Sequence, residues 1–90
     1  MNKTTTKKQT ETIELVIDEK EIILYNNDVN SFDHVIDSLI KICKHNPNQA
    51  EQCAFIVHYK GKCTVKRGSY EELETMCLSL LDKGLSAKIE

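Results

Sequence analysis

The sequence contains no tryptophan, one proline and three glycines, and it has no long run of apolar residues. A helix that crosses a membrane needs roughly 18 or more consecutive apolar residues, so the sequence predicts no membrane-spanning segment. The first eleven residues are polar and lack the apolar stretch of a secretory signal. We therefore expect a cytoplasmic protein that has no membrane partner.

The sequence also lacks an excess of charge of either sign. Twelve Lys and Arg residues against 14 Asp and Glu residues give a formal net charge of -2 and an isoelectric point near 5.9. Proteins that bind nucleic acid usually concentrate basic residues on one face, so we expect no nucleic-acid partner. Ninety residues are enough for one small domain, and no second domain is expected.

The four cysteines stand at positions 43, 53, 63 and 77 and include no Cys-x-x-Cys pair. Disulfides form in oxidising compartments, which the lack of an export signal disfavours. Three of the cysteines fall at apolar positions of expected helices, where an unpaired cysteine behaves as a small hydrophobic residue. We expect free, buried thiols and no cofactor, with a zinc site or a disulfide as the alternative.

The spacing of apolar residues predicts the strands and helices. Residues 1–11 are too polar to order themselves and are expected to form a flexible tail, ahead of one domain over 12–90. Alternation predicts strands, and repeats of three and four residues predict helices. The expected strands cover 13–17 (a strand or an arm), 22–25, 62–66 and 85–90, and helices are expected after Asn30, Asn46 and Ser69.

Capping residues mark the ends of these helices. Asn30 is expected to cap the first helix, and Asn46, followed by Pro47, the second. Gly61 suits the left-handed residue that ends the second helix, and the segment Ser69–Glu72 matches a capping box. The order β-α-α-β-α-β predicts an α+β fold, in which a small antiparallel sheet of about three strands packs against three helices on one face.

Asn26, Asp28 and His58 form a candidate binding site for a cation. An ammonium group has three N–H donors, and burying it is costly unless acceptors and a negative charge lie close. A carboxamide oxygen, a carboxylate and a neutral imidazole would supply them, and a protein's α-amino group is mostly protonated at pH 7. The alternative is an ordinary turn capped by its Asn and Asp side chains, with His58 satisfied by backbone at a helix end.

Two segments, Leu24–Phe32 with its Asn-x-Asp turn and Val57–Lys62 with the pattern Val-His-Tyr-x-Gly-Lys, resemble the signature segments of the ClpS family. Members of this family are bacterial and plastid adaptors that carry N-degron substrates to AAA+ Clp proteases. The resemblance runs from Glu21 to the C-terminus. It implies a non-enzymatic adaptor that binds proteins with an N-terminal hydrophobic residue and delivers them to a Clp ATPase.

The resemblance also implies roles for particular residues. Asn26, Asp28 and His58 would grip the substrate's α-amino group. A hydrophobic pocket would take the first side chain, typically Leu, Phe, Tyr or Trp. Its lining would be Asn30 at the rim with Phe32, Val35, Ala54, Val57 and Leu85 as walls. For these apolar positions the alternative is ordinary core packing, which pocket walls share.

The partner implied by the resemblance is the N-terminal domain of a Clp ATPase of the ClpA or ClpC type. Docking would use the third helix, where Glu71 matches the family and Met76 replaces a usual lysine. Glu71 can equally belong to a solvated acidic face at the helix start. By the same resemblance, the tail of residues 1–11 would enter the unfoldase during delivery.

Two further departures from the family pattern concern binding itself. Asn27 stands where an aspartate is usual, which removes a negative charge near the second substrate residue and predicts lower affinity. Ala54 stands where methionine is common, although Phe32 can refill part of the space. We therefore expect the pocket to tolerate N-terminal Ile and Val better than the family pattern does.

Three other functions are alternatives to that of an adaptor. A hydrolase could use His58 with Asp28 and a Ser or Cys nucleophile, but no motif positions a nucleophile or an oxyanion hole. A metal-binding module could use Cys43, Cys53, His45 and His58, whose spacing matches no familiar zinc pattern. A non-catalytic α+β interaction domain could dock on a Clp ATPase without amine capture, and Asn27 keeps this alternative open.

Overall fold

The computed structural model describes residues 19–90, which form three strands and three helices. In chain order these are β1 (Lys20–Tyr25), α3 (Phe32–Cys43), α4 (Pro47–Lys60), β2 (Lys62–Gly68), α5 (Tyr70–Asp82) and β3 (Ser86–Ile89). The predicted order β-α-α-β-α-β is confirmed. The expected tail over 1–11, the strand or arm over 13–17 and the domain boundary at 12 lie outside the described residues.

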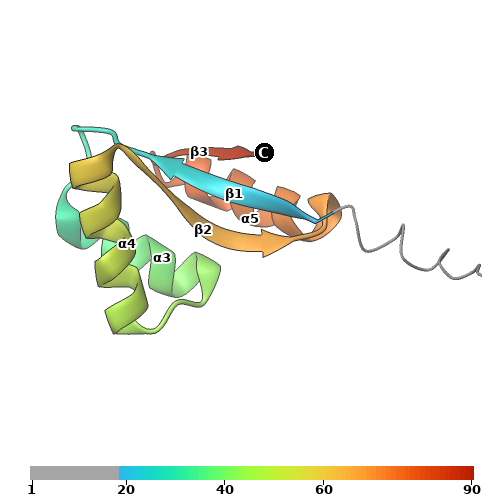
Figure 1. The fold of residues 1–90 in the computed structure, drawn as a ribbon, viewed down its shortest axis with the longest axis horizontal. Helices are drawn as coiled ribbons and strands as arrows, with labels where there is room; N and C mark the ends of the chain where they lie inside the picture. Colours follow the sequence, from blue (N-terminus) through green and yellow to red (C-terminus); the bar gives the residue numbers. More distant parts are fainter. Residues whose placement is uncertain (1–18) are drawn as a thin grey trace, which may run out of the picture.

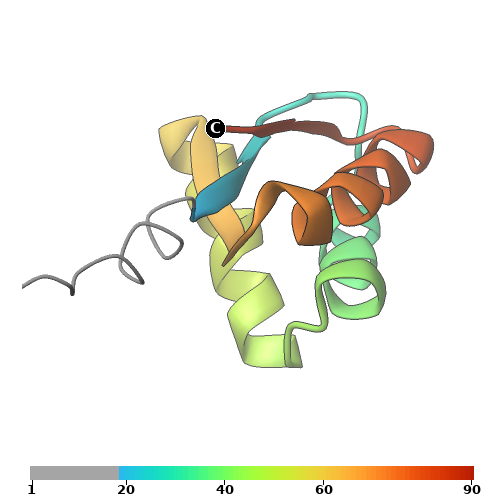
Figure 2. The same cartoon turned by 90° about the vertical axis from the view of Figure 1, so that its right-hand side faces the viewer.

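The sheet is antiparallel throughout, in the order β2-β1-β3, so the first strand of the chain is the central one (Figure 1). Residues of β1 alternate between buried and partly exposed, and Ile22 and Leu24 are its fully buried side chains. The pairing with β2 shifts between Ile22 and Ile23, a bulge that strengthens the local twist. The three helices lie on one face of the sheet (Figure 2).

The capping predictions are confirmed at two of the three helices. Asn46 accepts from the backbone of Gln49 ahead of Pro47 in α4, and Ser69 and Glu72 form both bonds of a capping box in α5. The prediction for α3 was wrong. Ser31, not Asn30, is its N-cap: the Ser31 side chain accepts from the His34 backbone N–H at 3.1 Å. Asn30 is one residue too early in the chain to take that position.

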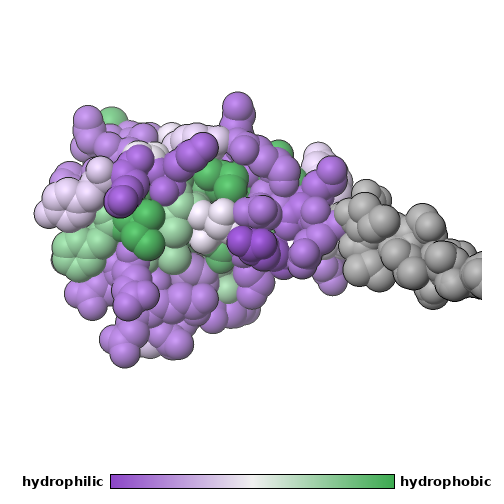
Figure 3. Space-filling model, in the orientation of Figure 1, coloured by the Kyte–Doolittle hydropathy of each residue, from purple (hydrophilic) through white to green (hydrophobic). Residues whose placement is uncertain are grey.

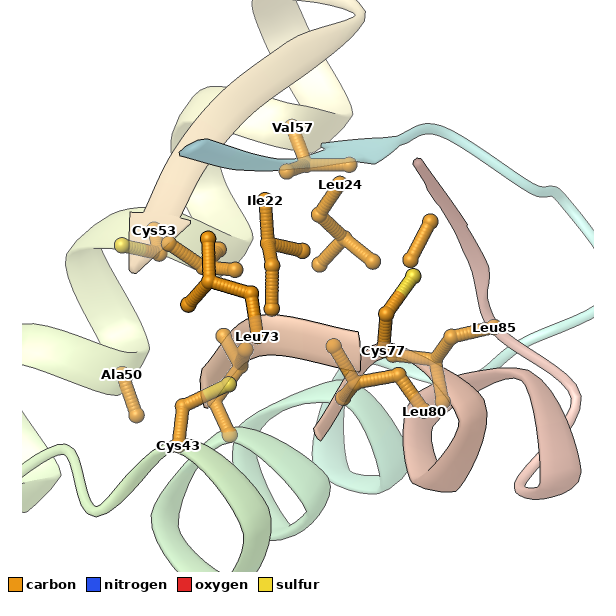
Figure 4. Close-up of a cluster of buried hydrophobic side chains, with 13 residues drawn as sticks. Ile22, Leu24, Cys43, Ala50, Cys53, Val57, Leu73, Cys77, Leu80 and Leu85 are labelled. Atoms are coloured by element: carbon orange, nitrogen blue, oxygen red, sulfur yellow. The ribbon is translucent and has the colours of Figure 1, made fainter. Parts of the chain in front are cut away.

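The core lies between the sheet and the helices. Ile22 and Leu24 point from β1 toward α3 and α5 (Figure 4). Leu39, Leu73 and Leu80, on α3 and α5, are fully buried beneath them. Burial of a Leu or Ile side chain contributes roughly 1.5–3 kcal/mol, so these five residues supply much of the hydrophobic stabilisation.

The cysteines are free thiols, and three of them belong to the core as predicted. Cys43, Cys53 and Cys77 are buried, whereas Cys63 on β2 is half-buried. Burial raises the pKa of Cys43 from 9.0 to about 11. Burial, followed by a hydrogen bond with Cys63, raises the pKa of Cys53 to about 12. At neutral pH these thiols are therefore protonated and behave as apolar core groups.

Within residues 19–90 no helix is both long enough and apolar enough to cross a membrane.

Candidate functional site

A recess opens where the end of β1, the loop after it, the start of α3 and the second half of α4 meet. It has a cavity volume of about 30 Å³. Every predicted pocket residue lines it, together with two members of the predicted amine-binding set. The lining consists of Leu24, Tyr25, Asn26, Asn27, Asn30, Phe32, Val35, Ala54, Val57, His58 and Leu85.

Polar side chains form one rim of the recess, and we call Asn26, Asp28 and His58 the polar rim. All three are exposed to solvent. Asp28 does not line the recess itself, but its Oδ1 accepts from the Asn26 Nδ2 amide at 3.1 Å. That bond orients Asn26 so that its carboxamide oxygen remains free as an acceptor. The polar rim thus places an amide oxygen, a carboxylate oxygen and an imidazole nitrogen at the opening of the recess.

The loop that carries Asn26 and Asp28 is held in place from several sides. The Asn26 backbone N–H donates to the Gly61 carbonyl at 2.9 Å, which joins the loop to the end of α4. Asn27 accepts from the Val29 N–H at 3.0 Å through its side chain, and its amide donates to the Ser86 hydroxyl at 3.1 Å. Because Gly61 and Ser86 are distant from the loop in sequence, the position of the polar rim depends on how α4 and β3 pack.

A second anchor fixes the far end of the same loop. The Asn30 amide donates to the Gly84 carbonyl at 3.1 Å, and the His34 ring lies 2.8 Å from the Lys83 carbonyl. Both bonds reach the segment between α5 and β3. Asn30, which the sequence predicted as a helix cap, therefore connects the recess loop to the chain just before Leu85.

Apolar side chains form the floor and walls of the recess. Leu24, Ala54, Val57 and Leu85 are each at most 5% exposed, and three of them, all but Ala54, also belong to the central core. These four residues therefore line the recess, and Leu24, Val57 and Leu85 also pack in the core. Phe32 is half-buried, and its ring meets the His58 ring edge-on with centroids 6.1 Å apart.

Sequence reasoning missed three residues of the lining as site members. Leu24 and Tyr25 end β1 immediately before Asn26, so their place in the chain was a usable signal. Asn27 was treated only as a departure from the family pattern. Its two side-chain hydrogen bonds make it a structural residue of the loop, and no local pattern reveals the bond to Ser86, which lies 59 residues away.

The predicted docking residues lie elsewhere. Glu71 is exposed in the first turn of α5, and Met76 is half-buried and packs against the core. Neither lines the recess.

The geometry also bears on the other functions. Among the described residues that line the recess, none is serine, cysteine or threonine, so a hydrolase would lack its usual nucleophile beside His58. Over residues 19–90, no group of three or more His, Cys, Asp or Glu side chains is arranged to hold a metal ion. His45 and the cysteines on α3 and α4 are buried, whereas His58 is exposed at the end of α4.

Comparison with known proteins gives a family match over most of the chain. The family model described as ATP-dependent Clp protease adaptor protein ClpS matches residues 17–88. No curated protein matches the sequence significantly. A solved structure of ClpS2 from Agrobacterium tumefaciens, bound to L-phenylalaninamide, superposes with a TM-score of 0.78 at 18% identity, covering 81% of this chain and 95% of that one. At this identity the structural match establishes a shared fold.

Proposed function

Because the chain belongs to the ClpS family of ATP-dependent Clp protease adaptor proteins, we propose that it captures proteins by a free, hydrophobic N-terminal residue. It then delivers them to a Clp AAA+ ATPase for proteolysis, and it catalyses no reaction itself. The observation that carries this proposal is the single recess that combines the polar rim of Asn26, Asp28 and His58 with an apolar floor.

The polar rim suits a primary ammonium. Each of its N–H donors can find one acceptor: the free carboxamide oxygen of Asn26, a carboxylate oxygen of Asp28 and a ring nitrogen of His58. Asp28 also supplies the negative charge that offsets removal of the cation from water. An acetylated amine has one donor and no charge, so it would leave two of the three acceptors unused.

The apolar floor suits the side chain of the same residue. ClpS2 of Agrobacterium tumefaciens binds L-phenylalaninamide, which joins a free amine to an aromatic side chain. In the present protein the cavity of about 30 Å³ is room for a few water molecules. We infer that Phe32, half-buried at the wall, shifts outward when a large side chain enters.

The partner in delivery is a Clp ATPase, and we propose its N-terminal domain, of the ClpA or ClpC type, as the docking site. The exposed Glu71 and the half-buried Met76, both on α5, would belong to the contact. They lie outside the recess, so substrate and ATPase can be bound together. Delivery of this kind takes place in the cytoplasm, and residues 1–11 would enter the unfoldase with the substrate.

Charge-removing variants test amine capture. Titration of the protein with a peptide that begins with free Leu should show about tenfold weaker binding for Asp28→Asn, because hydrogen bonds to charged groups contribute about 1.5–3 kcal/mol and Asp28 is exposed. Asn26→Ala should weaken binding to a similar degree. Glu51→Gln removes one negative charge from α4 without touching the recess and should bind as the wild type does.

The narrow cavity favours a second candidate, a domain that docks on a Clp ATPase without capturing amines. This alternative predicts that the Leu-led peptide binds neither the wild type nor the variants, while the Clp ATPase N-terminal domain still binds. Equal affinity of Asp28→Asn and wild type for the peptide would also contradict amine capture by the polar rim.

A further inference from the structure

Two aromatic side chains of α4 remain at the surface beside the recess, and we call Phe55 and Tyr59 the aromatic shelf. Phe55 is 44% exposed and Tyr59 is 74% exposed. They are four residues apart on one face of the helix, and their rings stack nearly parallel, at 10° with centroids 6.1 Å apart. Figure 3 shows apolar residues reaching the surface over α4 and toward the sheet.

The aromatic shelf is continuous with the recess. The Phe55 ring meets the edge of Phe32 with centroids 4.8 Å apart, and the Tyr59 ring meets His58 at 4.7 Å. Phe32 and His58 both line the recess, whereas neither shelf residue does. The two rings therefore extend the wall of the recess outward, past the polar rim and onto the open surface.

Core packing does not account for the aromatic shelf. Neither ring belongs to the central cluster of buried residues or to the half-buried side chains that pack against it. Exposed stacked rings gain little from the solvent-exposed part of their surface, and aromatic residues are enriched where proteins bind partners. A further hydrophobic group laid on the shelf would bury area that is now in water.

The backbone of a bound N-terminus would bring such a group to the shelf. With the amine at the polar rim and the first side chain in the recess, the next Cα lies only about 3.8 Å further along the chain. Side chains of an extended segment alternate in direction, so the second side chain points out of the recess. Tyr59 adjoins His58, one of the residues that would hold the amine, so the shelf lies within reach of that side chain.

We propose that Phe55 and Tyr59 form a second subsite, which takes the side chain of the substrate's second residue and prefers an aromatic or large apolar one. This subsite rests on the proposed function, because it needs the amine and the first side chain to be seated in the recess. It makes the recognised signal two residues long, with a hydrophobic residue at each position.

The test compares two peptides that begin Leu-Phe and Leu-Ser and are otherwise identical, by fluorescence anisotropy. The wild type should bind Leu-Phe about three- to tenfold more tightly than Leu-Ser, the range expected for one added aromatic contact. The ratio of the two affinities should fall to near one in Tyr59→Ser and in Phe55→Ser. The ratio is the readout because any general effect of these variants on amine capture cancels in it.

Two variants serve as controls. Tyr59→Phe keeps the stacked ring and should keep the ratio. Tyr70→Ser removes a ring that is 52% exposed at the start of α5, remote from the recess lining, and should also keep it. A ratio near one in the wild type, or a ratio unchanged in both shelf variants, would overturn the subsite while leaving amine capture intact. Failure of both peptides to bind would overturn the proposed function and the subsite with it.

Discussion

Two residues of the polar rim, Asn26 and Asp28, combine a structural hydrogen bond with an unused acceptor. The Asn26 amide N–H donates to one carboxylate oxygen of Asp28. The carboxamide oxygen of Asn26 and the other carboxylate oxygen of Asp28 remain free to accept. No hydrogen bond of His58 is present among the described side chains, so both ring nitrogens stay available. The bond between Asn26 and Asp28 orients the free acceptor of each residue before a ligand arrives, which lowers the cost of ordering them on binding.

Peptide binding should weaken in acid because His58 has to accept a hydrogen bond. A neutral imidazole accepts through one nitrogen, whereas an imidazolium only donates and repels an ammonium. We expect weaker binding of a Leu-led peptide in acid than at neutral pH. The measurement is a titration at several pH values. His58→Ala, which binds weakly throughout, should lose this pH dependence, and a flat profile in the wild type would exclude the role.

Ala54 should set how well branched first residues are accepted. It is 2% exposed in the recess floor, so Ala54→Met places added bulk directly into the cavity. The ratio of affinity for an Ile-led peptide to that for a Leu-led one should fall about fourfold, since a buried methylene contributes about 0.8 kcal/mol. Competition titrations measure the ratio, and thermal unfolding checks that the variant folds. A ratio that does not move would remove Ala54 as a determinant of specificity.

The residues of the recess could be predicted from the sequence to a large extent, and the exceptions have physical causes. Asn26, Asp28 and His58 were predicted because a turn and a helix end carry them in recognisable patterns. Asn30 was predicted as a cap from a local rule, yet its amide binds the Gly84 carbonyl 54 residues away. Local rules cannot weigh such a contact, because it depends on how α5 and β3 pack.

The helices follow their sequence signals more closely than the strands do. All three begin at a residue whose side chain caps the backbone, and Gly61 ends α4 with φ of +95°, a value that favours glycine. Strand β2 runs two residues beyond its predicted end, and the bulge in its pairing with β1 was not predicted. Where a strand ends depends on the strand with which it pairs, and the sequence of one strand alone does not reveal that partner.

The capping box of α5 should stabilise the fold measurably. Ser69 accepts from the Glu72 backbone N–H at 3.2 Å, while the Glu72 side chain accepts from the Ser69 N–H at 3.0 Å. Ser69→Ala should therefore lower the free energy of unfolding by about 1 kcal/mol, the usual cost of losing a cap. Urea unfolding measures the change. Thr75→Ala, at an exposed position inside the same helix, should leave stability unchanged or slightly higher, and an equal loss in both variants would contradict the capping argument.

Buried cysteines and one buried histidine help to fill the interior of the molecule. His45 is 4% exposed, and its Nε2 lies 2.7 Å from the Val65 carbonyl, which joins the segment between α3 and α4 to β2. The sequence indicated His45 as a possible ligand of a metal-binding module and did not predict its burial. Its burial could not be predicted because the partner lies 20 residues further on and in another layer of the fold.

The buried thiols should make the fold sensitive to alkaline pH. The pKa values of Cys43 and Cys53, about 11 and about 12, exceed the ordinary 9.0, so the folded state keeps protons that the unfolded chain releases above pH 9. The free energy of unfolding should then fall from about pH 9 to about pH 12, and be fully retained below pH 9. Urea unfolding at about pH 8 and about pH 10.5 measures the loss.

Cys43→Val is the matched variant for this measurement, because it fills a similar volume and does not ionise. Its stability should fall less between the two pH values than that of the wild type. Tyr25, whose pKa is raised by its hydrogen bond to Glu90, adds to the alkaline loss in both proteins, so the difference between them isolates the thiol. Identical losses in the two proteins would contradict the role of the buried Cys43.

The most direct test of amine capture is a fluorescence-anisotropy titration of the wild type with one labelled peptide in two forms, beginning with free Leu and with N-acetyl-Leu. Acetylation removes the positive charge and two of the three N–H donors, adds an acetyl group at the N-terminus, and leaves the rest of the peptide unchanged. We expect saturable binding of the free form and a loss of binding on acetylation. Equal binding of both forms, or binding of neither, would contradict capture of the N-terminus in the recess.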